Sequence, residues 1–237
     1  IRLSLVGSEM CIRDRAKGKD ERTGDTSMAN PNEALVNEPR EAILDAAALC
    51  FMERGFNATS IDDIARRLSA TKGMVYHYFS SKAELFFEIH HRAMDALFDG
   101  LTPIAESGLP APERFTAMAE SYVRTLILTQ PYQRTVSEAV QMLLRSSTTA
   151  EQRAQLERLQ ARRNRCEELF MAVLEEGIGN GTMQAVRPRV SIKPVFGAMN
   201  SVIQWYHPRE GDTPAQLTEL INDCLLYTSD AADDSGC

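Results

Sequence analysis

The 237-residue sequence lacks several features that define large classes of protein. It has no run of about 18 apolar residues, so no segment is expected to span a membrane. It has no sustained alternation of apolar and polar residues, which argues against β-strands. It contains no P-loop, no Gly-x-Ser-x-Gly nucleophile elbow and no His-Glu-x-x-His zinc motif. These absences argue against a membrane protein, a β-rich fold and the common hydrolases. We therefore expect that the protein is not an enzyme.

Cysteine and histidine are scarce as well. Five cysteines are present, and only Cys50 and Cys166 lie away from the ends of the chain, each in an apolar helical setting. Two separated thiols suggest no disulfide framework and suit a reducing compartment, so we expect a cytoplasmic protein. His90 and His91 are adjacent and would point about 100° apart on a helix, which makes a poor metal pair. We therefore predict no metal, no cofactor and no catalytic site.

Both ends of the chain resemble translated sequencing-adapter sequence, at residues 5–15 and 224–234. We expect residues 1–27 to be a non-native leader and residues 224–237 an adapter-derived tail; the alternative is that both are genuine tails. The segment between them, which starts at Met28, carries 20 basic and 25 acidic residues. Because this segment is acidic, any contact with nucleic acid must come from a local patch.

Helical periodicity covers the rest of the chain and predicts an all-α fold. The first helix is expected from about residue 38 to 54, with Pro39 in its first turn and Gly55 as its left-handed end. A break rich in Pro and Gly is expected from Gly100 to Pro112. The other expected helices lie at about 60–68, 72–79, 81–97, 112–129, 131–145, 149–177, 188–206 and 214–223. This pattern indicates a small N-terminal helical unit followed by a larger one.

The most informative segment is residues 60–79, where two short helical patterns flank a tight break. This is the outline of a helix-turn-helix, which places its second helix in the major groove of DNA. The second pattern opens with small or flexible side chains that allow close approach to base edges. Gly73 costs this helix about 1 kcal/mol relative to Ala, and a close approach of the backbone to DNA would explain that cost.

The chemistry of this segment suits two kinds of DNA contact. Lys72 can reach a guanine edge or a phosphate, whereas tyrosine and histidine tips suit phosphate oxygens. A helix N-terminus at Ser60 offers free N–H groups to a phosphate. The alternative for each side chain is half-buried packing or a solvated surface. The predicted DNA-contacting residues are Thr59, Ser60, Thr71, Lys72, Gly73, Met74, Tyr76, His77, Tyr78 and Lys82.

Residues 37–97 resemble the N-terminal domain of the TetR family of bacterial transcriptional repressors. The resemblance is carried by Gly55-Phe56, Thr59-Ser60-Ile61, Ile64-Ala65, Thr71-Lys72-Gly73 and Tyr76-His77-Tyr78-Phe79. It implies a three-helix DNA-binding domain over 37–97, and a helical ligand-binding and dimerisation domain over 98–223. It also implies a homodimeric, ligand-released repressor on a palindromic operator in double-stranded DNA. Asp62 and Asp63 are implied to help cap the second helix and to stay clear of the DNA.

The larger unit is rich in methionine and aromatic residues, which suit an adaptable apolar pocket. Ordinary core packing is the alternative for each of them. The segment from Trp205 to Gly211 resembles a segment of regulators that sense acyl-CoA thioesters, so the effector is expected to be an acyl-CoA or another apolar small molecule. The candidate ligand-binding residues are Met94, Phe98, Met118, Tyr122, Met142, Phe170, Met199 and Trp205. The arginines considered for CoA phosphates, against a solvated helix face, are Arg158, Arg162, Arg163 and Arg165.

Two other functions stay open at this point. The chain could be a helical sensor module that binds a small molecule without acting as a repressor, or an all-helical enzyme that uses the larger cavity. Binding to the DNA that flanks its own gene would argue against the first, and turnover of a bound ligand would favour the second.

Overall fold

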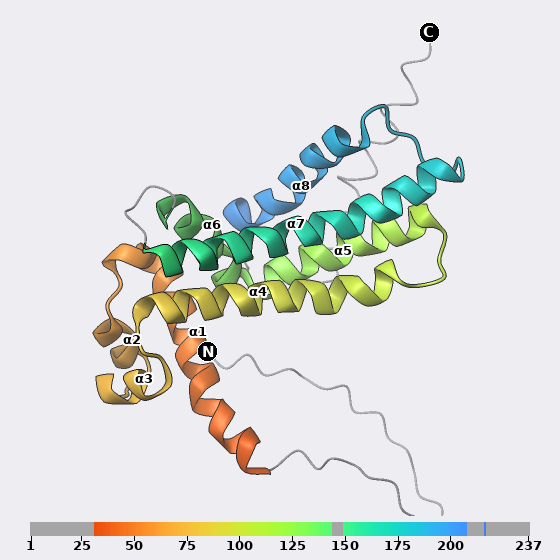
Figure 1. The fold of residues 1–237 in the computed structure, drawn as a ribbon. Coiled ribbons are helices and arrows are strands. Elements are labelled where there is room, and N and C mark those ends of the chain that lie inside the picture. The colour runs from red at the N-terminus through yellow and green to blue at the C-terminus, as the bar shows by residue number, and fades with distance from the viewer. Residues whose placement is uncertain (1–30, 144–148, 208–215, 217–237) are drawn as a thin grey trace, which may run out of the picture.

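The computed structural model describes residues 31–143, 149–207 and 216. Within these residues the fold is all-helical, as the sequence predicts. The helices are α1 (Pro31–Ala58), α2 (Ile61–Arg67), α3 (Lys72–Tyr78), α4 (Lys82–Ala105), α5 (Ala111–Leu128), α6 (Gln130–Leu143), α7 (Ala150–Gly179) and α8 (Pro188–Trp205). Figure 1 shows α1, α2 and α3 at one end of a bundle formed by α4 to α8. The helix expected at 214–223 lies, apart from residue 216, outside the described residues.

The first helix is longer than predicted. It begins at Pro31, so Pro39 lies inside α1 and not in its first turn. Proline fixes φ near its helical value, so it can continue a helix while removing one backbone hydrogen bond. Gly55 interrupts α1 with φ 77° and ψ 160°, angles that glycine adopts at little steric cost. The predicted end of the regular helix at Gly55 is therefore confirmed, although a short helical stretch continues to Ala58.

The small unit has its own hydrophobic core, built from apolar residues that recur at helical spacing in α1, α2 and α4. The rings of Phe51, Phe56 and Phe86 follow one another with centroids 5.3 and 5.4 Å apart. Ser81 caps α4 by accepting the N–H of Glu84 at 3.1 Å. The fully buried residues of this core are Ile43, Leu44, Ala47, Ala48, Phe51, Ile64, Val75, Phe79, Leu85, Phe86 and Ile89.

Helix α4 belongs to both units. Leu85, Phe86 and Ile89 enter the first core, whereas Met94 and Leu97 enter the core of the larger unit. The helix therefore runs without a break through the domain boundary expected between residues 97 and 98. This continuity ties the helix-turn-helix directly to the larger bundle.

The break expected from Gly100 begins only after Ala105, so this prediction is wrong in position. Ser121 of α5 donates a hydrogen bond to the carbonyl of Gly100 at 3.1 Å. A Cβ atom at residue 100 would lie 2.7 Å from the Ser121 hydroxyl oxygen. Gly100 therefore serves close packing of α4 on α5, and this packing outweighs the low helix propensity of glycine.

The second core lies among α4, α5, α7 and α8. Its centre is a cluster of edge-to-face aromatic rings, in which Phe170 contacts Phe115, Tyr122 and Phe196 at centroid distances of 5.1 to 6.0 Å. Such pairs stabilise a core beyond the area they bury. Among the described helices, none is both long enough and apolar enough to cross a bilayer.

Candidate DNA-binding surface and ligand chamber

The helix-turn-helix consists of α2, a tight turn and α3. Ser60 and Asp63 form the predicted capping box: the Ser60 hydroxyl accepts the N–H of Asp63 at 3.2 Å, and the Asp63 carboxylate accepts the N–H of Ser60 at 3.0 Å. The Ser60 hydroxyl also donates to the Asp63 carboxylate at 2.6 Å, and this bond and the one from the Ser60 N–H, with the Arg66 guanidinium nearby, hold the pKa of Asp63 well below its usual range. The turn passes through Ser69 at φ 53°, and the N–H of Ala70 returns to the carbonyl of Ala65 at 2.9 Å.

Helix α3 is held from one side only. Its buried residue is Val75, and the following residue Phe79 is also buried. Thr71 caps the helix by accepting the N–H of Met74 at 3.2 Å, which starts α3 at Lys72. Met74 is 38% exposed and Tyr76 is 47% exposed. The outer face of α3 therefore has the exposure that a groove-binding helix needs.

Gly73 has no packing role among the residues that the structure describes. A Cβ atom at this position would meet only the Thr71 hydroxyl oxygen, at 3.9 Å, which is ordinary van der Waals contact. The described part of the chain therefore offers no packing reason for glycine in the first turn of α3. Close approach of another molecule to this turn stays the interpretation that fits best.

Lys72 forms an ion pair across the helix-turn-helix. Its Nζ lies 2.9 Å from Oδ2 of Asp62, and both side chains are about half exposed. The hydrogen bond that Lys72 donates to the Asp62 carboxylate raises the pKa of Lys72. The family resemblance implied that Asp62 helps to cap α2, but the side chain that caps α2 is that of Asp63, and the Asp62 carboxylate binds Lys72.

A chamber of about 300 Å³ lies in the larger unit among α4, α5, α6, α7 and α8. Its apolar wall consists of Met94, Leu97, Val136, Cys166, Phe196 and Ile203. Its polar and charged groups are those of Tyr122, Gln133, Ser137, Gln160, Arg163, Asn164, Glu167, Lys193 and Asn200. Burial raises the pKa of the Cys166 thiol to about 12, so Cys166 is a neutral part of the wall and not a nucleophile. This mixed lining suits a small molecule with apolar and polar parts.

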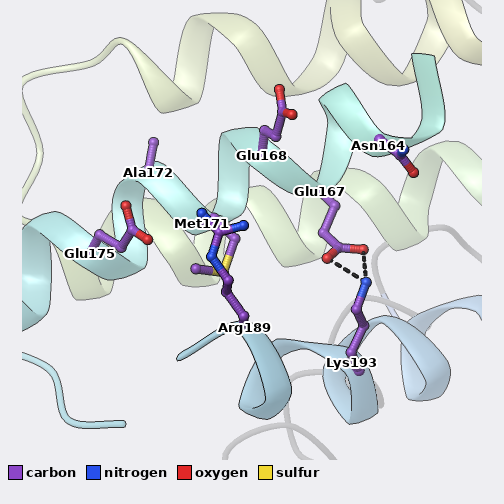
Figure 2. A pocket seen from close by; sticks show the side chains of 8 residues that line it. All are labelled: Asn164, Glu167, Glu168, Met171, Ala172, Glu175, Arg189 and Lys193. Atoms are coloured by element: carbon purple, nitrogen blue, oxygen red, sulfur yellow. Dashed lines mark hydrogen bonds and ion pairs between the residues drawn. The ribbon is translucent and has the colours of Figure 1, made fainter. Parts of the chain in front are cut away.

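An open groove of about 570 Å³ adjoins the chamber between α7 and α8. Figure 2 shows Glu167 on α7 facing Lys193 on α8, whose Nζ bonds both carboxylate oxygens at 2.6 and 2.8 Å. Glu167, Lys193 and Asn164 line both the chamber and the groove. The ion pair therefore lies at the boundary between the two spaces.

Residues 43–89 match the family described as bacterial regulatory proteins, tetR family, and residues 108–228 match the tetracyclin repressor-like, C-terminal domain. The chain belongs to the TetR family. It is a DNA-binding transcriptional regulator and not an enzyme, as the sequence predicts. The resemblance seen over residues 37–97 is confirmed and extends through the larger unit.

Several relatives span most of the chain. The HTH-type transcriptional repressor KstR2 of Rhodococcus jostii is 28% identical over 173 residues, which are 71% of this chain and 80% of that protein. The TetR regulator PfmR of Thermus thermophilus is 27% identical, with a TM-score of 0.65 over 78% of this chain and 97% of its own. AibR in complex with isovaleryl coenzyme A and operator DNA is 23% identical, with a TM-score of 0.63 over 79% and 97%. At that identity the AibR likeness shows the fold alone.

Two of the predicted DNA-contacting side chains are occupied inside this TetR domain. Thr59 is 1% exposed, and its hydroxyl donates to the carbonyls of Cys50 and Gly55 at 3.1 and 2.9 Å. The Lys82 ammonium donates to the carbonyls of Phe56 and Thr59 at 2.7 and 2.8 Å and lies 4.5 Å from the Phe56 ring centre. These contacts fasten the end of α1 to α4 and occupy both side chains, so we expect Lys82 to position the helices and not to bind a phosphate. A phosphate contact of the backbone N–H groups at this helix N-terminus stays a prediction.

Lys82→Met is expected to lower the free energy of unfolding by about 1–3 kcal/mol, because it leaves part-buried carbonyls without their donor. The salt dependence of DNA binding should stay unchanged, since Lys82 does not neutralise a phosphate in this account. Urea denaturation and salt-dependent DNA titration measure the two quantities. A stability equal to wild type, together with a salt slope smaller by about 0.9, would return Lys82 to the DNA contacts.

The other predicted DNA-contacting residues lie on or beside α3, except Ser60, which caps α2. Tyr76 is exposed, and the His77 and Tyr78 rings meet edge to face with centroids 5.0 Å apart. Tyr78 is half-buried and packs partly against the small core. The hydroxyl oxygens of Ser60 and Thr71 accept backbone N–H groups and so cap α2 and α3. Their contact with DNA stays a prediction.

The structure brings only part of the predicted ligand set to the chamber. Met94 and Tyr122 line it, whereas Met118, Phe170 and Met199 are buried in the core around it. Phe98 packs beside the core under the Arg162 guanidinium. Trp205 is 52% exposed at the end of α8 and is absent from the lining, so its assignment is corrected. The Met142 side chain lies outside the described residues.

Apart from Tyr122 and Arg163, sequence reasoning missed the polar members of the lining. Gln133 is 5% exposed on α6, and Asn200 on α8 accepts a hydrogen bond from the Tyr122 hydroxyl at 3.0 Å. Both stand within otherwise apolar helix faces. An amide at a core position is the sequence signal that could have found them, because buried amides need partners.

Proposed function

We propose that this TetR-family regulator is a repressor that binds a palindromic operator as a homodimer and is released when a small molecule fills the chamber. The observation that supports this most is the position of α6. One face of α6 lines the chamber with Gln133, Val136 and Ser137, and the same helix packs against α1 of the DNA-binding unit. A ligand that displaces α6 would therefore act on α1, which packs against α2 of the helix-turn-helix.

The contacts between α6 and its neighbours are specific. The Tyr132 hydroxyl donates to the Asp45 carboxylate, and the Thr135 hydroxyl donates to the carbonyl of Ala48 at 3.2 Å, both on α1. From its buried position Gln133 donates to the carbonyl of Ala93 in α4 at 3.2 Å. The effector can shift DNA affinity only by its own preference for one arrangement of these helices over another.

The chamber suits the acyl part of an acyl-CoA thioester or a similar amphipathic molecule, and the groove offers Arg189 and Lys193 to its phosphates, although Glu167, Glu168 and Glu175 lie beside them. The apolar wall would take the acyl group, and a larger polar part would extend past the Glu167–Lys193 pair into the groove. Of the arginines considered for phosphate contact, Arg163 lines the chamber, whereas Arg162 pairs with Asp95. The AibR complex with isovaleryl coenzyme A supports this ligand class by analogy of fold alone.

Helix α8 supplies the face that we assign to the homodimer. Val190 and Trp205 are 60% and 52% exposed, which is unusual for large apolar side chains. With Pro194, Ala198 and Ser201 they recur every three or four residues, so they lie along one side of α8. A two-fold pair would present two α3 helices to half-sites about one turn of DNA apart, or a multiple of it.

The test is release of a bound operator by ligand. We expect a short- or medium-chain acyl-CoA to weaken operator binding by about five- to 150-fold, and coenzyme A alone or the free acid to act less. Arg163→Ala should reduce this response, whereas Arg158→Ala, on the same helix but outside the chamber lining, should not.

Operator affinity that is unchanged by every thioester would exclude this class of effector, and tighter operator binding would make the ligand a co-repressor. A protein that binds ligand but no duplex would be a sensor module without repressor activity.

A further inference from the structure

The cations of the helix-turn-helix are matched by carboxylates. Among the described residues of this region, from Arg54 to Lys82, each Arg or Lys except Lys82 lies within 4 Å of an acidic oxygen. The pairs are Arg54–Asp63 at 3.1 Å, Arg66–Asp63 at 2.9 Å, Arg67–Glu53 at 2.7 Å and Lys72–Asp62 at 2.9 Å. Non-specific attraction to DNA comes from cations that neutralise phosphates, so this pairing limits such attraction.

The Lys72–Asp62 pair differs from the others in where it lies. Lys72 is the first residue of α3 and the only lysine or arginine in that helix. The other pairs join α1 to α2 or lie within α2, whereas this one joins α2 to α3. Asp62 is therefore the acidic side chain that pairs with the cation at the N-terminus of α3, the helix proposed to contact the bases.

We propose that Asp62 is a specificity-determining residue, which holds Lys72 in place and withholds its charge from non-cognate phosphates. A lysine ammonium has three N–H donors, so one bond to Asp62 leaves two for a guanine edge. A phosphate at a random position must instead draw Lys72 away from a carboxylate that already binds it. Asp62 thus weakens non-cognate binding more than cognate binding, which raises the ratio of the two affinities.

Asp62→Asn tests this proposal, because it removes the charge and keeps the shape. Fluorescence anisotropy would follow binding to the operator and to an unrelated duplex between about 50 and 200 mM salt. We expect the variant to bind the unrelated duplex about two- to fivefold more tightly, with a salt slope steeper by about 0.9. Operator affinity should change less, so the specificity ratio falls. An unchanged ratio would overturn the proposal.

A double-mutant cycle with Lys72→Ala separates this role from simple repulsion of phosphate by Asp62. If Asp62 acts through Lys72, Asp62→Asn changes nothing in the Lys72→Ala background. An undiminished effect there would mean direct repulsion and would overturn the proposal. Glu53→Gln is the matched control, since it removes the same charge from the pair with Arg67. It should leave the specificity ratio unchanged, and an equal fall would also overturn the assignment to Asp62.

The inference rests on the DNA contact proposed for α3, and the two can fail separately. Wild-type protein that binds no duplex would contradict the function itself. Wild-type protein that binds a specific operator, with an unchanged ratio in Asp62→Asn, would contradict only the role of Asp62. Thermal denaturation of each variant confirms that the fold is intact, as expected for an exposed pair.

Discussion

Phe86→Ala is expected to lower the free energy of unfolding by about 3–5 kcal/mol, and to abolish operator binding at physiological temperature. Phe86 is fully buried, and its ring lies 5.4 Å from Phe56 and 5.5 Å from Phe87. It joins α4 to the end of α1, which in turn supports α2. Because a domain is stable by only about 5–15 kcal/mol, this cavity would populate unfolded forms of the DNA-binding unit.

Chemical denaturation and DNA titration measure the two effects of Phe86→Ala. The matched control is Phe98→Ala, which makes the same chemical change three turns along α4, at a partly buried residue of the larger unit. It should cost less stability and leave the helix-turn-helix able to bind. A denaturation midpoint for Phe86→Ala equal to that of wild type would contradict the core described here.

His90→Leu is expected to remove a large part of the pH dependence of stability. His90 is fully buried between the two cores, and neither ring nitrogen has a hydrogen-bond partner among the described residues. Burial, with the positive charge of Arg163 nearby, lowers the pKa of His90 to about 3. The unfolded chain, with a histidine pKa of about 6.5, therefore binds a proton that the folded chain rejects. The free energy of unfolding is therefore not reduced by His90 above about pH 6.5, and it falls as the pH drops from there toward 3.

For wild type this amounts to a loss of about 2 kcal/mol between pH 7 and pH 5 from His90 alone. The leucine variant should lack this loss, and at pH 7 it should be as stable as wild type or more so, since no polar group is left unpaired. Urea denaturation at the two pH values gives the comparison, with His91→Gln on the half-exposed neighbour as control. Equal pH dependence in wild type and His90→Leu would rule out this assignment.

The features that the sequence predicts well are those with local causes. The capping of α2 by Ser60 and Asp63, the start of α3 after Thr71 and the interruption at Gly55 each depend on neighbouring residues. The apolar stripes of α1, α2 and α4 recur at helical spacing, which predicts the first core. These local signals were enough to place the helix-turn-helix and its exposed helix α3.

The features that the sequence did not predict depend on partners far along the chain. Lys82 binds carbonyls more than twenty residues away, so its spacing gave no sign that the ammonium is already occupied. The sequence predicts a loop at Gly100, because no residue near it in the chain shows that it packs against Ser121 of another helix. The chamber is formed by five helices, and no single segment encodes which of its apolar side chains face the cavity and which fill the core.

The central claim is that two α3 helices, presented by a homodimer, bind base edges in a palindromic operator. Selection of bound duplexes from a random pool, followed by sequencing, tests this claim most directly. The account predicts an enriched inverted repeat with half-site centres about 10–10.5 base pairs apart or a multiple of that spacing, and loss of enrichment at one position per half-site in Lys72→Ala. Folded protein that enriches no sequence, or only a single half-site, would contradict it.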